Sequence, residues 1–416
     1  MNDIRFTSDE RAALRAHGIV LFAERVIFDA QPPMPASQIA AVQALCAGPL
    51  PEALLALWQQ TAGGRLDYDL TLEMNGNIEA VSWSELFWNG SDGYRDLQGW
   101  IVHEQELAEE AAEDGGPPWQ GTLALLPFGG FEYCDRIYAV VEPGADYGRI
   151  VAWKQGLPPA WTHALHEDGL SVVAADLPAA FAALHLDDDP LAPTSDYFSG
   201  QTLLAYLDDR HQDHGLDLDL MDKLVAFYRL AMHDWRTPLA EGTLRHQPDL
   251  ARAALRHAVA TDDAALIVEL AAAGLRFEGP LQGSALATDV ALAHGAFVAA
   301  AALVRAGAPV AADALRNIDG QIGPELTAAL LANGAEPDVE AIVQCAACGA
   351  PASAHLIAEA CSGIGIDVPK AFDADRAAKL QELESALAQL ADGHHGHYLG
   401  REGLAQRIER LQGFRL

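Results

Sequence analysis

The first half of the chain changes from a helical to an extended pattern of hydrophobic residues. Residues 50–64 place Leu and Trp side chains on one helical face between a proline and a Gly-Gly pair, which predicts a short amphipathic helix. Residues 66–73 then alternate apolar with polar, the spacing of a half-buried strand. Further apolar runs separated by Gly-Gly and Pro-Gly predict an antiparallel sheet from residues 122–128, 135–141 and 149–153.

Helical patterns lie before, between and after these strands. A first helix is predicted within residues 8–26, with Ser8 as its cap and its end near Gly18 or shortly beyond, and a closing helix over residues 177–186. The acidic segment 102–114, between the strand groups, is read as a helix or a loop. The first module is therefore predicted to be an α+β domain in which helices cover one face of an antiparallel sheet.

The second half shows no strand pattern and repeats a helix ending. Helices end in the same pattern of small residues and Gly at three places, Gly274, Gly307 and Gly334, which are 33 and 27 residues apart. A fourth, degenerate unit covers residues 339–368 and is expected to end near Gly363. Pairs of short Ala-rich helices cannot bury their apolar faces alone, so these units are predicted to stack as an all-α repeat solenoid.

Changes in composition suggest the boundaries between these parts. Charge and proline gather in residues 187–195, which is typical of a linker. We therefore expect an α+β domain, a linker with connecting helices, helical repeats and C-terminal capping helices over residues 1–188, 189–245, 246–370 and 371–416.

The net charge narrows the choice of partners. The chain carries 59 Asp and Glu against 26 Lys and Arg, a formal charge of −33. Nucleic acid and anionic membrane surfaces are excluded as expected partners, because both need cations on the protein. A basic protein would be attracted instead, although acidity also serves solubility. Sparse cysteines are typical of a reducing compartment, and the longest apolar run, residues 296–304, is too short to span a membrane. The charged start does not resemble a secretory signal, so we expect a cytoplasmic protein.

Candidate chemical motifs are incomplete. Cys345 and Cys348, with His355 or Cys361, could begin a zinc site, but no second pair follows and small Cys side chains also pack well in helices. Isolated His groups occur at His163 and His166 and at His394, His395 and His397, and an acidic run covers residues 208–222. None has the spacing of a peptidase, EF-hand or phosphate-binding motif. We therefore assign no catalytic residue, no metal and no cofactor.

Aromatic and acidic residues adjoin each other between residues 83 and 114. Aromatic side chains often anchor protein interfaces, although they also pack in cores. If the first module has an interface, we expect it here, formed by Trp83, Trp88, Tyr94, Glu109, Glu110, Glu113 and Asp114. The concave face of the repeats is the second candidate surface.

Two short motifs stand out in the first module. The first is Leu50-Pro-Glu-Ala-Leu with the glycine pair at 63–64, and the second is residues 126–135, Leu-Pro-Phe-Gly-Gly-Phe-Glu-Tyr-Cys-Asp, leading to residues 148–153. Both resemble motifs of the SUKH superfamily. Order and rough spacing match across residues 35–186, although the segment 89–121 is longer than the family pattern. The second half resembles ankyrin repeats in its 33-residue step and helix ends, without the Thr-Pro-Leu-His signature.

These resemblances imply a function. Many bacterial SUKH-like proteins are immunity proteins that bind and neutralise toxin domains, often nucleases, and ankyrin proteins occur in the same role. We therefore expect an immunity protein that binds a basic cognate toxin stoichiometrically. The alternatives are an ankyrin-type scaffold or regulatory adaptor without a toxin, and a hydrolase with a metal held by Asp217 and Asp219.

Overall fold

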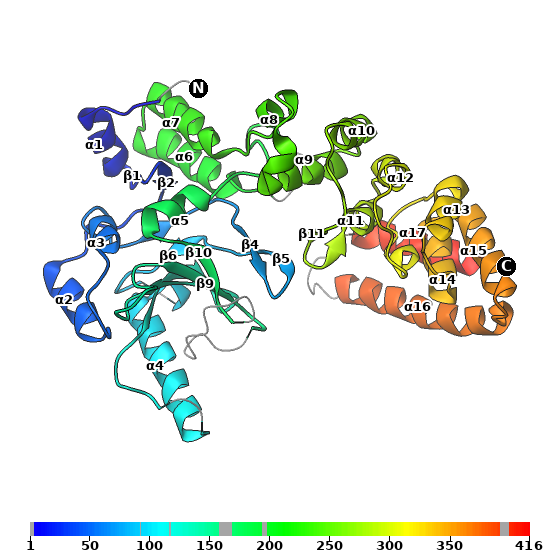
Figure 1. The fold of residues 1–416 in the computed structure, drawn as a ribbon, viewed down its shortest axis with the longest axis horizontal. Coiled ribbons are helices and arrows are strands. Elements are labelled where there is room, and N and C mark those ends of the chain that lie inside the picture. Colours follow the sequence, from blue (N-terminus) through cyan, green and yellow to red (C-terminus); the bar gives the residue numbers. More distant parts are fainter. Residues whose placement is uncertain (1–3, 92, 116–117, 158–168, 194–197, 392–398) are drawn as a thin grey trace. The chain divides into compact units, whose positions relative to one another are not determined.

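The computed structural model divides into two compact units, Met1–His233 and Asp234–Leu416. It describes residues 4–91, 93–115, 118–157, 169–193, 198–391 and 399–416. An antiparallel sheet with helices occupies the first unit, and helices dominate the second (Figure 1). This confirms the predicted succession of an α+β part and a helical part.

The first unit is built on a six-stranded antiparallel sheet. In sheet order its strands are β10 (Ser171–Ala174), β9 (Ile150–Lys154), β8 (Asp135–Val140), β7 (Leu125–Phe131), β6 (Glu85–Leu86) and β3 (Gly64–Arg65). The central strands β7, β8 and β9 overlap the three predicted apolar runs, with β7 starting three residues later than predicted. Register along β8 pairs Tyr138 with Pro127 on one side and with Val151 on the other.

The segment predicted as one strand, residues 66–73, ends in a separate hairpin. β4 (Thr71–Met74) pairs with β5 (Asn77–Ala80) through a turn in which Asn75 and Gly76 have positive φ, at 51° and 73°. Such a turn matches the twist of the two strands. Burial alternates over residues 66–70 as predicted, but regular pairing begins only at Thr71.

The first predicted helix ends close to Gly18, as expected, and the rest of residues 8–26 is not helical. α1 ends at Ala16 (Ser8–Ala16), and residues 20–27 form a hairpin of β1 (Val20–Phe22) and β2 (Arg25–Ile27). Ala23 and Glu24 both have positive φ, which a helix does not allow. The cap also differs, because the Thr7 side chain accepts from the backbone of Glu10 in a capping box.

Helices lie on both faces of the sheet, where the sequence predicted one covered face. The remaining helices of this part are α2 (Ala36–Ala44), α3 (Glu52–Trp58), α4 (Leu97–Glu113) and α5 (Leu177–Ala183). One face joins the main core around Trp83, whose ring packs edge-on against Phe128 and Phe181. The opposite face of β8 meets α4, because Arg136 lies over the Trp100 ring and Tyr138 bonds to Glu104.

The connecting helices predicted within residues 189–245 pack into the first core. α6 (Gln201–His214) and α7 (Leu218–Tyr228), followed by the 3-10 turn η3 (Arg229–Ala231), carry aromatic rings into it. The ring pairs are Tyr206 with Phe28, Phe227 with Phe6 and Tyr228 with Tyr68, at 5.3, 5.4 and 4.8 Å. The first unit therefore extends to residue 233 instead of 188, and residues 187–193 form a loop inside it.

The second unit is a row of packed helices. Its longer elements are α8 (Arg236–Ala240), α9 (Pro248–Ala260), α10 (Ala264–Ala272), α11 (Ala287–Ala293), α12 (Phe297–Arg305), α13 (Pro324–Ala332), α14 (Val339–Cys348), α15 (Pro351–Gly363), α16 (Val368–Ala391) and α17 (Gly400–Gly413). A short hairpin, β11 (Pro280–Gln282) with β12 (Ala285–Leu286), was not expected. Within the described residues, no helix has both the length and the apolar surface needed to cross a membrane.

The predicted helix endings share one backbone geometry. Gly274, Gly307 and Gly334 all have positive φ, at 84°, 81° and 117°. After each glycine the next N–H donates to a leucine carbonyl five residues back: Leu275 to Leu270, Ala308 to Leu303 and Ala335 to Leu330. The fourth unit repeats this at Gly365, with Ile366 donating to Cys361, two residues beyond the predicted Gly363.

Candidate functional site

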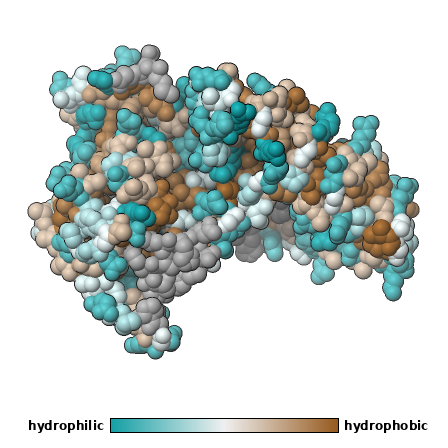
Figure 2. Space-filling model, in the orientation of Figure 1, coloured by the Kyte–Doolittle hydropathy of each residue, from teal (hydrophilic) through white to brown (hydrophobic). Residues whose placement is uncertain are grey.

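The predicted acidic residues lie together at the C-terminal end of α4. Glu109, Glu110, Glu113 and Asp114 are all exposed, and the last turn of the helix contains no basic residue. None of the four has an ion-pair partner among the described residues. Figure 1 shows this end of α4 projecting beyond the sheet, and Figure 2 shows hydrophilic residues gathered there. We call these four carboxylates the α4 acidic end.

The predicted aromatic residues separate into core and surface. Trp83 is only 1% exposed and belongs to the core, so its prediction as a binding residue is wrong. Trp88 is half-buried and lies under the Arg95 guanidinium, 5.3 Å from its ring centre. Tyr94 is 47% exposed and remains available to a partner.

Tyr133 is an exposed aromatic residue that the sequence did not indicate as a site. It lies in the turn between β7 and β8, is 54% exposed, and packs edge-on against Tyr94 with 5.1 Å between ring centres. Trp100 supports it from α4 at 5.2 Å. We call Tyr94 and Tyr133 the tyrosine pair. Tyr133 belongs to the sequence motif at residues 126–135, but its position beside α4 depends on the pairing of β7 with β8.

A buried carboxyl lies in the middle of α4. The Tyr138 hydroxyl donates to Glu104 Oε1 at 2.7 Å, and burial raises the pKa of Glu104 above its usual range. Burial likewise lowers the pKa of Arg136 on the same strand as Tyr138. A pocket of about 300 Å³ opens beside this carboxyl, lined among others by Ala108, Trp119 and Glu142.

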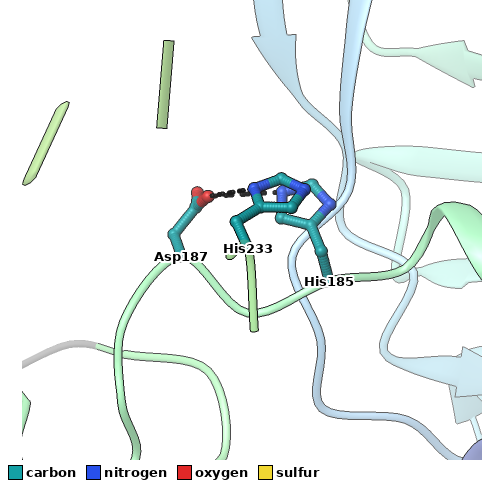
Figure 3. Close-up of side chains that lie close together, drawn as sticks. All are labelled: His185, Asp187 and His233. Atoms are coloured by element: carbon teal, nitrogen blue, oxygen red, sulfur yellow. Dashed lines mark ion pairs between the residues drawn. The ribbon is translucent and has the colours of Figure 1, made fainter. Parts of the chain in front are cut away.

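A second cluster joins two histidines and one aspartate within the first unit (Figure 3). His185 Nε2 lies 3.4 Å from Asp187 Oδ1, and His233 Nδ1 lies 3.5 Å from the same oxygen. The two imidazole rings stack with 3.9 Å between centres and 17° between planes. His185 and Asp187 follow α5, whereas His233 follows η3. Because His233 is far from His185 and Asp187 in the sequence, no short motif indicates that the three residues form a cluster.

Backbone pairing brings these side chains together. His185 and Asp69 exchange two backbone hydrogen bonds, and Leu186 pairs with Met232. The Asp69 carboxylate accepts from the Asp187 N–H and from the Ser199 hydroxyl, both at 2.8 Å. Burial, and then repulsion by Asp187, raise the pKa of Asp69. Burial alone would lower the pKa of His185, but the Asp187 carboxylate reverses this and the net direction is upward.

The other candidate ligands have structural roles or lie outside the described residues. Cys345 and Cys348 are buried in α14, and among the described residues only the histidine–aspartate cluster brings three ligand groups together. Asp217 caps α7 by accepting from the Leu220 N–H, and neighbouring Asp219 is exposed. His163, His166, His394, His395 and His397 lie outside the described residues.

Comparisons with family models, with curated proteins and with solved structures found no match to this chain.

Proposed function

We propose that this protein binds another protein, a basic toxin domain, and neutralises it by forming a stoichiometric complex. The observation that carries this proposal is the α4 acidic end: four exposed carboxylates on one projecting helix terminus, without counter-charges among the described residues. A cationic enzyme whose cleft binds a polyanion such as nucleic acid is a suitable partner, because the acidic end carries the same negative charge as that polyanion.

The acidic end is placed where it costs stability. A helix C-terminus carries partial negative charge, so each carboxylate there is unfavourable by about 0.3–1 kcal/mol at low salt. Residues three and four apart on this helix are also like-charged, which adds repulsion. A functional requirement for a concentrated negative field accounts for an arrangement that folding alone disfavours.

The tyrosine pair supplies apolar contact area beside the N-terminal part of the same helix. Tyr94 precedes the first turn of α4, and Tyr133 packs on Trp100 within that helix. A helix of 17 residues spans about 25 Å, so the pair and the acidic end delimit a surface of ordinary interface width. Exposed tyrosines backed by buried rings lose little conformational freedom on binding, as interface anchors require.

Two family assignments support the same proposal. We propose a SUKH-like fold for the first unit, since α3 and the β7–β8–β9 strands lie where its motifs occur. We propose an ankyrin-like stack for the second unit, since helix pairs recur with the same glycine ending and a short hairpin joins two of them. Immunity by binding is the function that both resemblances imply.

The decisive experiment is an affinity measurement with the purified product of the adjacent gene, at low and high salt. We expect a one-to-one complex that weakens with salt. A variant with Glu109→Gln, Glu110→Gln, Glu113→Gln and Asp114→Asn should weaken it at least about tenfold. The matched control changes the same number of charges at exposed sites of the second unit, by Glu325→Gln, Glu359→Gln, Asp373→Asn and Glu384→Gln, and should bind normally.

Two results would contradict the proposal. Equal weakening by both variants would show that overall charge, rather than the α4 acidic end, drives association. No complex at low salt would favour the alternative, an ankyrin-type scaffold or adaptor without a toxin. In that case the partner would be sought with the second unit.

A further inference from the structure

The histidine–aspartate cluster has the features of a cation site and lies outside the α4 surface. Its two facing ring nitrogens, His185 Nε2 and His233 Nδ1, are buried and have no hydrogen-bond partner among the described residues. Both are within 3.5 Å of one carboxylate oxygen of Asp187. An arrangement of this kind needs an electropositive centre between its members.

The hydrogen bond made by His185 Nδ1 shows which ring nitrogen of His185 carries the lone pair. His185 Nδ1 lies 3.0 Å from the Ala183 carbonyl oxygen, which can only accept, so Nδ1 carries the proton. In a neutral imidazole the other nitrogen, Nε2, then presents a lone pair. That lone pair faces the Asp187 oxygen, and two acceptors at this distance repel unless a proton or a metal ion lies between them.

The two nitrogen–oxygen distances are those of a tetrahedral metal ion. With metal–nitrogen and metal–oxygen bonds of about 2.1 Å, neighbouring ligand atoms in a tetrahedron are about 3.4 Å apart, against roughly 3.0 Å in an octahedron. The observed separations are 3.4 and 3.5 Å, and all three ligand atoms lie within 4.8 Å of one another. We propose that His185 Nε2, His233 Nδ1 and Asp187 Oδ1 bind a divalent transition-metal ion, best Zn²⁺.

The surroundings of the ligands suit such a site. Metal-bound imidazoles usually donate their second N–H to a carbonyl or carboxylate, as His185 does to Ala183. The Asp187 backbone is held by the Asp69 carboxylate, which is itself held by Ser199. Asp187 is exposed, which leaves a fourth position open to water. Imidazole and carboxylate without thiolate select Zn²⁺ and its neighbours over Cu⁺ or Ca²⁺.

The ion would connect two segments of the first unit. His185 and Asp187 belong to the loop after α5, and His233 is the last residue of this unit. Metal binding therefore fixes the point where the chain leaves the first core, next to the Leu186–Met232 pairing. The expected role is structural, and it is independent of any toxin binding.

The test is Zn²⁺ titration of the full chain against a chromophoric chelator. Because His394, His395 and His397 could also take up metal, all measurements use a chain in which these three are changed to Ala. We expect one Zn²⁺ per chain, an increase in melting temperature on binding, and the intense visible absorption of tetrahedral Co²⁺ when cobalt replaces zinc.

Single variants separate the site from background. His233→Gln and Asp187→Asn should each weaken Zn²⁺ binding at least about 100-fold and abolish the increase in melting temperature. His294→Gln, an exposed histidine of the second unit, should leave both unchanged. Circular dichroism checks that each variant is folded. Absence of saturable binding in the folded chain, or equal binding by His233→Gln and the control, would overturn the proposal and leave a proton as the bridging cation.

Discussion

The five cysteines differ in how far their thiols lie from solvent. Burial raises the pKa of Cys46 and of Cys345 to about 12, and Cys348 and Cys361 are also buried, whereas Cys134 is partly exposed. Only the thiolate reacts, so we expect Cys134 alone to react quickly with DTNB at about pH 8, and all five after denaturation. Cys134→Ser should remove the fast reaction. A second fast thiol would contradict the burial of the other four cysteines.

The buried carboxyl of Glu104 predicts a pH dependence of stability. Its pKa in the folded protein lies above the ordinary value of 4.5, chiefly because of burial. Below the raised pKa the folded state binds a proton that the unfolded state does not yet bind. The contribution of Glu104 to stability therefore increases as the pH falls through the folded pKa, and it is complete below about 4.5.

Glu104→Gln keeps an acceptor for the Tyr138 hydroxyl and cannot titrate. Urea unfolding midpoints measured from neutral pH down to about pH 4.5 should show wild type gaining stability relative to this variant as the pH falls. Tyr138→Phe checks the partner, since it removes the hydrogen bond that favours the charged form and should leave the raised pKa in place. Parallel pH profiles for wild type and Glu104→Gln would show that Glu104 titrates normally.

At the scale of elements, the glycines that end the repeated helices can be tested one by one. Gly307 has φ of 81° and open space around its Cα, so Ala there is unfavourable for backbone reasons alone. We expect Gly307→Ala to lower the free energy of unfolding by roughly 1–2 kcal/mol. Gly363 is the matched control, because it is helical and unobstructed, and Ala there should raise stability by up to about 1 kcal/mol. Reversed signs would contradict these helix ends.

Elements with strong local signals were predictable from the sequence. α3 lies between its proline and its glycines, and the turn at Asn75–Gly76 follows from residues that tolerate positive φ. The hairpin at residues 20–27 has no sequence signal, because its mixture of apolar and charged residues has no distinct period and its turn at Ala23–Glu24 has no glycine. The hairpin there is held by long-range contacts, such as the Tyr68 hydroxyl accepting from the Val26 N–H.

The same distinction applies to the candidate sites. The α4 acidic end follows directly from composition, because a run of carboxylates is solvated wherever the helix lies. Trp83 and Tyr133 could not be told apart, since both are aromatic and only the fold buries one of them. His185 and His233 are brought together by the backbone pairing of Leu186 with Met232. A long-range pairing of this kind leaves no local pattern in the sequence.

At the scale of the whole molecule, the extent of the first unit determines which fragments fold. A fragment of residues 1–233 should be soluble and unfold cooperatively, because it keeps α6 and α7. A fragment of residues 1–188 should aggregate or bind hydrophobic dyes, since it exposes Phe6, Phe28 and Tyr68. Size-exclusion chromatography and near-ultraviolet circular dichroism distinguish these outcomes. A native, monomeric 1–188 fragment would restore the boundary that the sequence suggested.

Because Tyr228 packs against Tyr68, the first core can be completed only after residue 228 has been translated. Phe6, Phe28 and Tyr68 are synthesised well before α6 and α7, whose rings cover them only when residues near 228 have left the ribosome. At roughly 5–20 residues per second, these three rings stay uncovered for at least several seconds. During this interval the chain depends on its own negative charge, or on chaperones, to avoid association with neighbouring nascent chains.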